Sequence, residues 1–177
     1  MPEPENQLYP AVETWLKNRM GCYATGINTG IRYARIDAVG IRDVGGDLSG
    51  LSEVVAIEVK RGVTPFSNAV GQAHSYSVYA DRCYLADSQT KPYSDEEIRI
   101  ASHLGVGLLA ISTNARGARQ VKKILTAPVT RPLDGMRLLV AEKLGYSQCT
   151  ICNSMFKRGE KAVGRRTSRA QRHVPGR

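Results

Sequence analysis

The period of the apolar residues changes along the chain and divides it into short segments. The first segment carries four apolar residues at helical spacing, Leu8, Val12, Leu16 and Met20. This spacing predicts a helix at about residues 8 to 20, which Gly21 would end because glycine is favoured just past the last turn. Residues 31 to 43 and 53 to 60 are rich in Ile and Val, and they predict two strands that form a hairpin with a long connection.

The second half of the chain alternates between the helical and the extended pattern. The expected elements are a helix starting near residues 64 to 67 and running to 79, a strand at 82 to 87, a helix capped by Ser94 and Glu97, strands at 106 to 112 and 119 to 126, and a helix at 133 to 144. This order predicts an α/β fold of three layers, α/β/α, with a central mixed sheet. The composition shifts after Gly145, so we expect a domain at residues 1–145 and a short basic C-terminal arm at residues 146–177.

The net charge of +9 is concentrated near the C-terminus. Residues 157–177 hold eight Lys or Arg side chains against one acid, Glu160, which leaves +7 there and +2 in the other 156 residues. A tail of this kind is typical of a solvated chain end. It also suits binding to nucleic-acid phosphates through counterion release. An anionic membrane is a weaker alternative because the tail has no apolar face to insert.

Other compositional features point to a cytoplasmic protein that does not span a membrane. Apolar residues make up 42% of the chain, enough for a core, yet no apolar run approaches the ~20 residues of a membrane helix. The segment from Met1 to Gln7 is acidic and contains proline, unlike a secretory signal. Of the four cysteines, Cys22 and Cys83 are expected to be buried apolar side chains, and no disulfide framework is expected.

Polar residues interrupt both strands of the predicted hairpin. Asp37 stands in the middle of the first strand, where aspartate is disfavoured. In the second strand, Glu58 and Lys60 alternate with apolar residues and therefore point to one face. If the two strands pair, Asp37 and Glu58 converge. Each residue alone is compatible with a turn or an exposed ion pair, but their joint occurrence favours a shared site.

Two converging carboxylates and the main-chain carbonyl of Val59 would make an oxygen-rich site suited to Mg²⁺, which binds through few carboxylates and keeps several waters. Such an ion would activate a water for attack on phosphorus and neutralise charge on the phosphate. Lys60 would orient or deprotonate that water and stabilise the pentacovalent state. Asp37, Glu58 and Lys60 are therefore the candidate catalytic residues.

This arrangement resembles the PD-(D/E)xK nuclease superfamily, which includes restriction endonucleases, Mrr-like enzymes and archaeal Holliday-junction resolvases. Asp37 looks like the acid on the family's second core strand, and Glu58-Val59-Lys60 looks like its (D/E)-x-K. Ile36 stands where the motif has proline, a departure that the family tolerates. The resemblance covers roughly residues 5 to 145. It implies a restriction-endonuclease-like fold and a DNA endonuclease that depends on Mg²⁺ or Mn²⁺.

The resemblance also implies further site residues. Gln72 and Tyr76 match the Q-x-x-x-Y of the following helix, and they share a helix face because they are four residues apart. We expect Gln72 to position the site and Tyr76 to contact nucleic acid. The family's acid on the first helix corresponds to Glu5, a further metal ligand, with Glu13 as the alternative.

The pair Cys149-x-x-Cys152 has the spacing of a zinc knuckle. His173 is a candidate third ligand, and a fourth ligand would have to come from an acid, from water or from a second chain. Two thiols without metal, or a redox pair, are equally compatible with the spacing. If Zn²⁺ binds, it would fold the arm and present its arginines to DNA.

We expect DNA to be the partner, and several basic residues to contact it: Arg61, Lys157, Arg158, Arg165, Arg166 and Arg169. A homodimer would suit a duplex substrate because cutting both strands takes two sites. The alternative function is a non-catalytic DNA-binding protein that uses a nuclease-like body as scaffold and the basic arm for binding. A zinc-dependent regulator ranks last because its ligand set is incomplete.

Overall fold

The structure, a computed structural model, describes residues 4–32, 34–45, 51–88, 91–149 and 155–159. Its helical elements are η1 (Glu5–Gln7), α1 (Tyr9–Arg19), α3 (Phe66–Ser75), η2 (Tyr76–Val78), α4 (Asp95–His103) and α5 (Met136–Lys143). Its strands are β1 (Ala24–Ile31), β2 (Ala34–Asp43), β3 (Ser52–Lys60), β4 (Arg82–Asp87), β5 (Val106–Thr113), β6 (Arg119–Leu125), β7 (Tyr146–Gln148) and β8 (Met155–Lys157).

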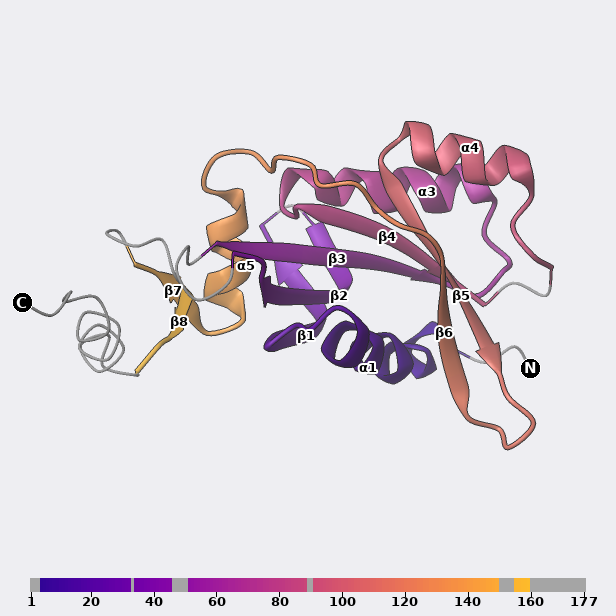
Figure 1. Ribbon diagram of the computed structural model, residues 1–177, viewed down its shortest axis with the longest axis horizontal. Helices are drawn as coiled ribbons and strands as arrows, with labels where there is room; N and C mark the ends of the chain where they lie inside the picture. Colours follow the sequence, from indigo (N-terminus) through magenta and orange to yellow (C-terminus); the bar gives the residue numbers. More distant parts are fainter. Residues whose placement is uncertain (1–3, 33, 46–50, 89–90, 150–154, 160–177) are drawn as a thin grey trace, which may run out of the picture.

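Six strands form one mixed sheet in the order β1-β2-β3-β4-β5-β6 (Figure 1). The pairs β1–β2, β2–β3 and β5–β6 are antiparallel, whereas β3–β4 and β4–β5 are parallel. The two parallel pairs require crossover connections, and α3 and α4 provide them. The carboxyl ends of β3, β4 and β5 therefore lie at the same end of the sheet.

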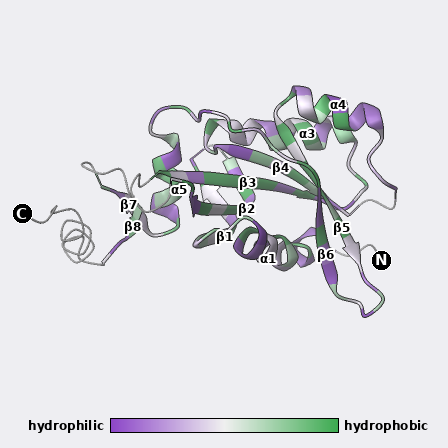
Figure 2. Ribbon diagram, in the orientation of Figure 1, coloured by the Kyte–Doolittle hydropathy of each residue, from purple (hydrophilic) through white to green (hydrophobic). Residues whose placement is uncertain are grey.

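Helices cover both faces of the sheet (Figure 1). On one face, α1 packs through Val12, Trp15 and Leu16 onto a core that includes Ile57 and Val59 of β3. On the other face, α3 and α4 pack over β4 and β5, and α5 packs over β1 to β3. Figure 2 shows long hydrophobic stretches on the central strands β3 and β4, which are buried between the layers.

The predicted fold class is confirmed: the chain has a three-layer α/β/α fold with a central mixed sheet, consistent with the restriction-endonuclease-like architecture. The capping box at the start of α4 is also present: the Ser94 hydroxyl oxygen accepts from the Glu97 amide, and the Glu97 carboxylate accepts from the Ser94 amide. Cys22 and Cys83 are both buried, as expected, and burial raises the pKa of each thiol to about 12.

The strand expected at residues 31 to 43 is present as β2, but it begins at Ala34, and Ile31 is the last residue of β1, a strand that was not expected. Arg32 lies between them with a φ of 30°, a turn conformation. The extended segment Ala24–Ile31 escaped the pattern because its two glycines and one asparagine interrupt any alternation, and it is held in place by pairing with β2.

The last described segments lie against the body of the protein. Strands β7 and β8 pair with each other, and Met155 is buried in the core beneath α5. The Arg158 guanidinium lies 3.0 Å from the Glu142 carboxylate of α5. The division into a domain at residues 1–145 and an arm at residues 146–177 stays a prediction. In the described ranges, no helix combines the length and apolar character needed to cross a membrane.

Candidate active site

The sheet splits at the carboxyl end of β3. Pairing between β2 and β3 runs from Asp43 opposite Ser52 to Ala38 opposite Ile57, and the next position would place Asp37 opposite Glu58. At that position the Asp37 side chain, rather than its backbone, bonds to β3: Asp37 Oδ2 accepts a hydrogen bond of 2.9 Å from the Val59 amide. Asp37 therefore closes the end of the ladder and holds its carboxylate in the split.

Glu58 and Lys60 lie beside Asp37 on β3. The Lys60 ammonium is 2.5 Å from Glu58 Oε1 and 3.5 Å from Glu5 Oε1, so it joins β3 to the η1 turn that precedes α1. Glu58 is only 4% exposed, and burial of a carboxylate is costly unless it has charged or hydrogen-bonding partners. The structure thus brings Asp37, Glu58, Lys60 and Glu5 together.

Two tyrosines hold the carboxylates from opposite layers. The Tyr9 hydroxyl of α1 donates to Asp37 Oδ1 at 3.1 Å, and the Tyr76 hydroxyl of η2 contacts Glu58 Oε2 and the Arg35 carbonyl oxygen, the latter at 2.8 Å. Burial and the neighbouring carboxylates raise the pKa of both phenols, which keeps both hydroxyls protonated as donors. Each carboxylate is therefore oriented by a fixed hydroxyl.

The charges in the site oppose one another. Burial, followed by the charge of Glu58, raises the pKa of Asp37 from 3.8 to about 6, although the Val59 amide and Lys60 act in the other direction. For Lys60, burial alone would lower the pKa, but the hydrogen bond to Glu58 and the charges of Glu58, Glu5 and Asp37 outweigh it, so the pKa is raised. The three carboxylates thus carry more negative charge than the single ammonium neutralises.

This charge pattern fits a divalent cation. Three carboxylates against one ammonium leave a formal charge of −2. Burial is the main cause of the raised pKa of Asp37, and the negative charges of Glu58 and Glu5 add to it. Within the described parts of the chain, no three Asp, Glu, His or Cys side chains lie close enough to form a ready-made metal centre. Lys60 instead contacts both Glu58 and Glu5.

The main-chain carbonyl of Val59 faces the same split. In a strand, the N–H and C=O of one residue point to the same edge, and the Val59 N–H points to Asp37. The neighbouring Lys60 carbonyl points the other way and accepts a bond from the Ser88 amide beyond β4. The oxygens available at the split therefore come from Asp37, Glu58 and the Val59 carbonyl.

Other residues expected at the site are placed less directly. Gln72 is exposed on α3, one turn before Tyr76 and therefore nearer the end of β3 at which Lys60 lies. Arg61 directly follows β3 and is half-buried. Glu13, the alternative to Glu5, is engaged elsewhere: it accepts from Thr25 at 2.7 Å and pairs with Lys17 at 2.8 Å.

The structure describes part of the C-terminal arm. Lys157 ends β8, Arg158 pairs with Glu142, and Cys149 directly follows β7 with intermediate exposure. The other residues expected to bind zinc or nucleic acid lie outside the described residues: Cys152, His173, Arg165, Arg166 and Arg169. The zinc knuckle therefore stays a prediction.

Sequence reasoning missed two residues at this end of the sheet. Tyr9 lay inside the Leu8-Tyr9-Pro10 run, but its distance in sequence from Asp37 gave no reason to assign it a role. Asp87, the last residue of β4, is 2% exposed and stands in register with Lys60 on the neighbouring parallel strand. A buried aspartate at the end of an apolar strand was the signal that could have identified it.

Comparisons with known proteins add little to this geometry. No family model matches the chain, and no curated protein matches it. Among solved structures, one that it resembles is SfsA of Pyrococcus furiosus in complex with Ca²⁺, with 14% sequence identity and a TM-score of 0.36, over 70% of this chain. The match spans 64% of that chain, somewhat under two thirds of its length. A likeness this distant carries no activity, metal or partner over to the present protein.

Proposed function

We propose that the protein is an endonuclease that hydrolyses DNA phosphodiester bonds with the help of Mg²⁺ or Mn²⁺. The observation that carries this proposal is the meeting of Asp37, Glu58 and Lys60 at the split between β2 and β3. The resemblance of the same residues to the PD-(D/E)xK motif supports it. Hydrolysis adds water to phosphorus and breaks one P–O ester bond, and the departing oxygen takes up a proton.

The proposed metal ligands are Asp37, Glu58 and the carbonyl oxygen of Val59, with Glu5 beside them. An ion bound there would act as a Lewis acid on the phosphate and lower the pKa of a coordinated water. The chain's own contribution is to hold two carboxylates side by side in a half-buried place, where their repulsion favours binding of a cation. Mg²⁺ suits these hard oxygen ligands.

Lys60 would act on the substrate. Its ammonium has three donors, and in the structure it bridges Glu58 and Glu5. A bound phosphate would offer oxygens as alternative acceptors for those donors, so Lys60 would stabilise the charge that develops during attack. Glu5 would keep the ammonium directed at the site.

Several residues would position the site rather than react. Tyr9 fixes Asp37, and Tyr76 fixes Glu58 while tying it to the β2 backbone at Arg35. The sequence suggested a nucleic-acid contact for Tyr76, but its side chain is 5% exposed, so we assign it the positioning role. Gln72, on the exposed surface one turn away, remains the residue of α3 that we propose to face the substrate.

The test is cleavage of plasmid, branched and single-stranded DNA by the full chain with Mg²⁺. We expect Lys60→Ala to abolish cleavage without changing the fold, whereas the exposed Lys91→Ala should cut like the parent protein. Circular dichroism and the thermal midpoint of unfolding confirm that both variants are folded. If no substrate is cut and calorimetry detects no binding of Mg²⁺ or Mn²⁺, the proposal is refuted.

The second candidate function is DNA binding without catalysis, which the basic arm favours. It predicts an affinity for DNA that falls steeply with salt and survives Lys60→Ala and Asp37→Asn. The nuclease proposal predicts that these two changes remove cleavage and leave affinity similar. On duplex DNA we propose that two copies act together, which the concentration dependence of double-strand cutting would reveal.

A further inference from the structure

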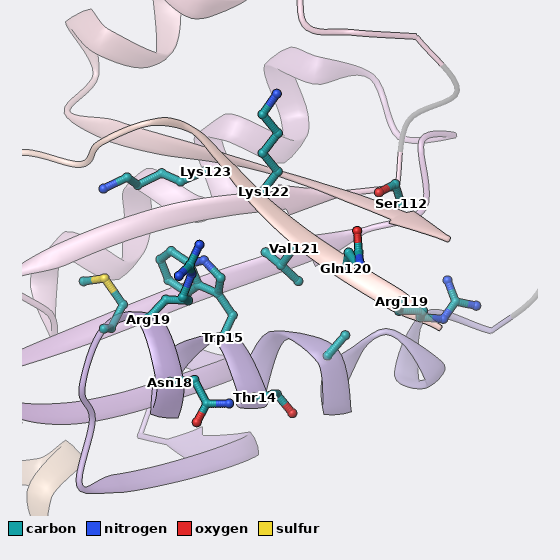
Figure 3. A pocket seen from close by; sticks show the side chains of 12 residues that line it. Thr14, Trp15, Asn18, Arg19, Ser112, Arg119, Gln120, Val121, Lys122 and Lys123 are labelled. Carbon is teal, nitrogen blue, oxygen red and sulfur yellow. The ribbon is translucent and has the colours of Figure 1, made fainter. Parts of the chain in front are cut away.

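A groove of about 960 Å³ lies between α1 and the edge strand β6, separate from the acidic cluster around Asp37. Figure 3 shows the side chains that line it, with α1 along one wall and β6 along the other. The lining residues come from α1, the end of β5 and most of β6: Ala11, Thr14, Trp15, Asn18, Arg19, Met20, Ser112, Arg119, Gln120, Val121, Lys122 and Lys123.

The groove is basic. Four of its lining residues are Lys or Arg, and among the described residues that line it none is acidic. Arg19, Lys122 and Lys123 are exposed, and none of the described ion pairs involves them. Several like charges in and at the rim of one groove raise the local potential and attract an anionic polymer.

The fold explains why these residues meet. On α1, the lining residues recur at spacings of three and four, so they form one stripe along the helix. On β6, Val121 lies opposite Ile111 and Lys123 opposite Leu109, and these pairs share the face that α1 covers. Lys122, between them, points away from α1 at the rim of the groove (Figure 3). A register shift follows Lys123, and among the strands that the structure describes β6 is the last of the sheet.

The groove and the candidate active site share helix α1. The lining of the groove begins at Ala11, two residues after Tyr9, whose hydroxyl bonds Asp37, and it extends along α1 to Arg19. At a rise of 1.5 Å per residue, the nine steps from Ala11 to Met20 span ~14 Å. Measured along the axis of a duplex, this length covers about four phosphate steps of one strand, at ~3.4 Å each.

We propose that this groove binds the phosphate backbone of DNA and guides it to the acidic site. The positive charges match a polyanion, and the length of the groove matches several phosphates rather than one small anion. The surface is unlike a membrane contact because its exposed members are mostly polar. The guiding role rests on the proposed nuclease function, whereas binding in the groove can be tested without any cleavage.

The test uses the full chain and a fluorescein-labelled 20-base-pair duplex in EDTA, so that no cleavage occurs. Fluorescence anisotropy gives the affinity over a range of salt concentrations. The test variant is Arg19→Ala with Lys122→Ala and Lys123→Ala, and the matched control is Arg99→Ala with Lys91→Ala and Lys143→Ala, all exposed and outside the groove.

We expect the groove variant to bind at least tenfold more weakly and to lose up to ~2.7 from the slope of log affinity against log salt, since each lost phosphate contact removes ~0.9. The control should keep the slope of the parent protein. The basic tail is unchanged in both variants, so its contribution cancels in the comparison.

Trp15 provides a direct reading of the groove because it is the only tryptophan in the chain and lines the groove wall. DNA in the groove should change its emission in the parent and the control, and this change should be lost in the groove variant at the same DNA concentration. Binding through the tail alone would leave the emission as it is in the free protein.

Several results would overturn the proposal. These are equal affinity and slope in the groove and control variants, an equal loss in both, or a Trp15 response that does not depend on the three groove residues. Binding of phosphatidylserine vesicles in place of DNA, with the same dependence on these residues, would identify a lipid surface instead. If the parent protein cleaves DNA and the groove variant binds DNA as tightly as the parent protein, the proposed nuclease function is kept and only the role of the groove is refuted.

Discussion

Replacement of Asp37 by asparagine should stabilise the metal-free protein at neutral and alkaline pH, although it removes a proposed metal ligand. Asparagine has the shape of aspartate and can keep both hydrogen bonds: its oxygen can accept from the Val59 amide, and its amide can donate to the Tyr9 hydroxyl oxygen. What the change removes is one negative charge that burial and Glu58 oppose.

The magnitude follows from the pKa. A rise from 3.8 to about 6 strengthens proton binding by roughly two powers of ten, which corresponds to ~3 kcal/mol against the ionised form. The Asp37 side chain is partly exposed, so solvent screening reduces this value, and we expect a gain of ~1–2 kcal/mol in the free energy of unfolding.

The effect should depend on pH with a defined sign. Because the pKa of Asp37 is higher in the folded than in the unfolded protein, the native carboxyl is protonated and costs nothing below pH 3.8. The cost develops as the pH rises from about 4 to 6 and stays constant above that. Asp37→Asn should therefore match the parent protein near pH 4 and exceed it in stability near pH 8.

Urea denaturation in EDTA at pH 4 and pH 8 measures this difference. The control is Asp134→Asn, an almost fully exposed acid, whose stability should stay within ~0.5 kcal/mol of the parent protein at both pH values. Adding Mg²⁺ at pH 8 should stabilise the parent protein and not Asp37→Asn. An ion stabilises the folded state only if the folded state binds it, and Asp37→Asn lacks a proposed metal ligand.

Lower stability of Asp37→Asn at pH 8 would refute this reasoning, and so would an equal gain at pH 4 and pH 8. The first result would mean that the carboxylate is held favourably by its donors. The second would mean that the effect does not come from ionisation.

Three further predictions concern other parts of the molecule. Tyr76→Phe should lower the free energy of unfolding by ~1–3 kcal/mol and weaken Mg²⁺ binding measured by calorimetry, because Glu58 loses its donor. Burial raises the pKa of Glu53, but hydrogen bonds from two arginines outweigh burial and lower it below 4.5. The ionised Glu53 should therefore stabilise the protein above pH 4.5, and this stabilisation should be lost as the pH falls further. In urea titrations, Glu53→Gln should lose less stability than the parent protein over this pH range. Gly107→Ala should lower the thermal midpoint because the new Cβ would lie 2.6 Å from a backbone nitrogen, whereas Gly71→Ala, in open space on α3, should raise stability by ~0.5–1 kcal/mol.

The central residues of the candidate site could be predicted because local patterns determine them. Glu58 and Lys60 stand two apart at the end of a mostly apolar strand, so their shared face follows from the period of the strand. Asp37 was conspicuous because its neighbours are apolar. The hairpin that brings the two strands together is the simplest connection between consecutive antiparallel strands.

The residues that orient the site could not be predicted from local pattern. Tyr9 and Asp37 are 28 residues apart in sequence, and Tyr76 reaches a carbonyl 41 residues away. These residues come together only when α1 and α3 pack on opposite faces of the sheet. The groove is a similar case, since Arg19 meets Lys122 and Lys123 only through the packing of α1 against β6. Strand β1 was not predicted because its pairing with β2, rather than the strand propensity of its own residues, makes it a strand.

The split in the sheet has a consequence for how the candidate site forms during folding. The carboxylates come from neighbouring strands, their donors from two helical layers, and the lysine's second acid from the turn before α1. A chain that has formed its hairpin but not docked both layers would hold the acids without the hydroxyls that orient them. The candidate site is therefore a property of the completed tertiary structure, and under the proposed function partly folded chains would not cleave DNA.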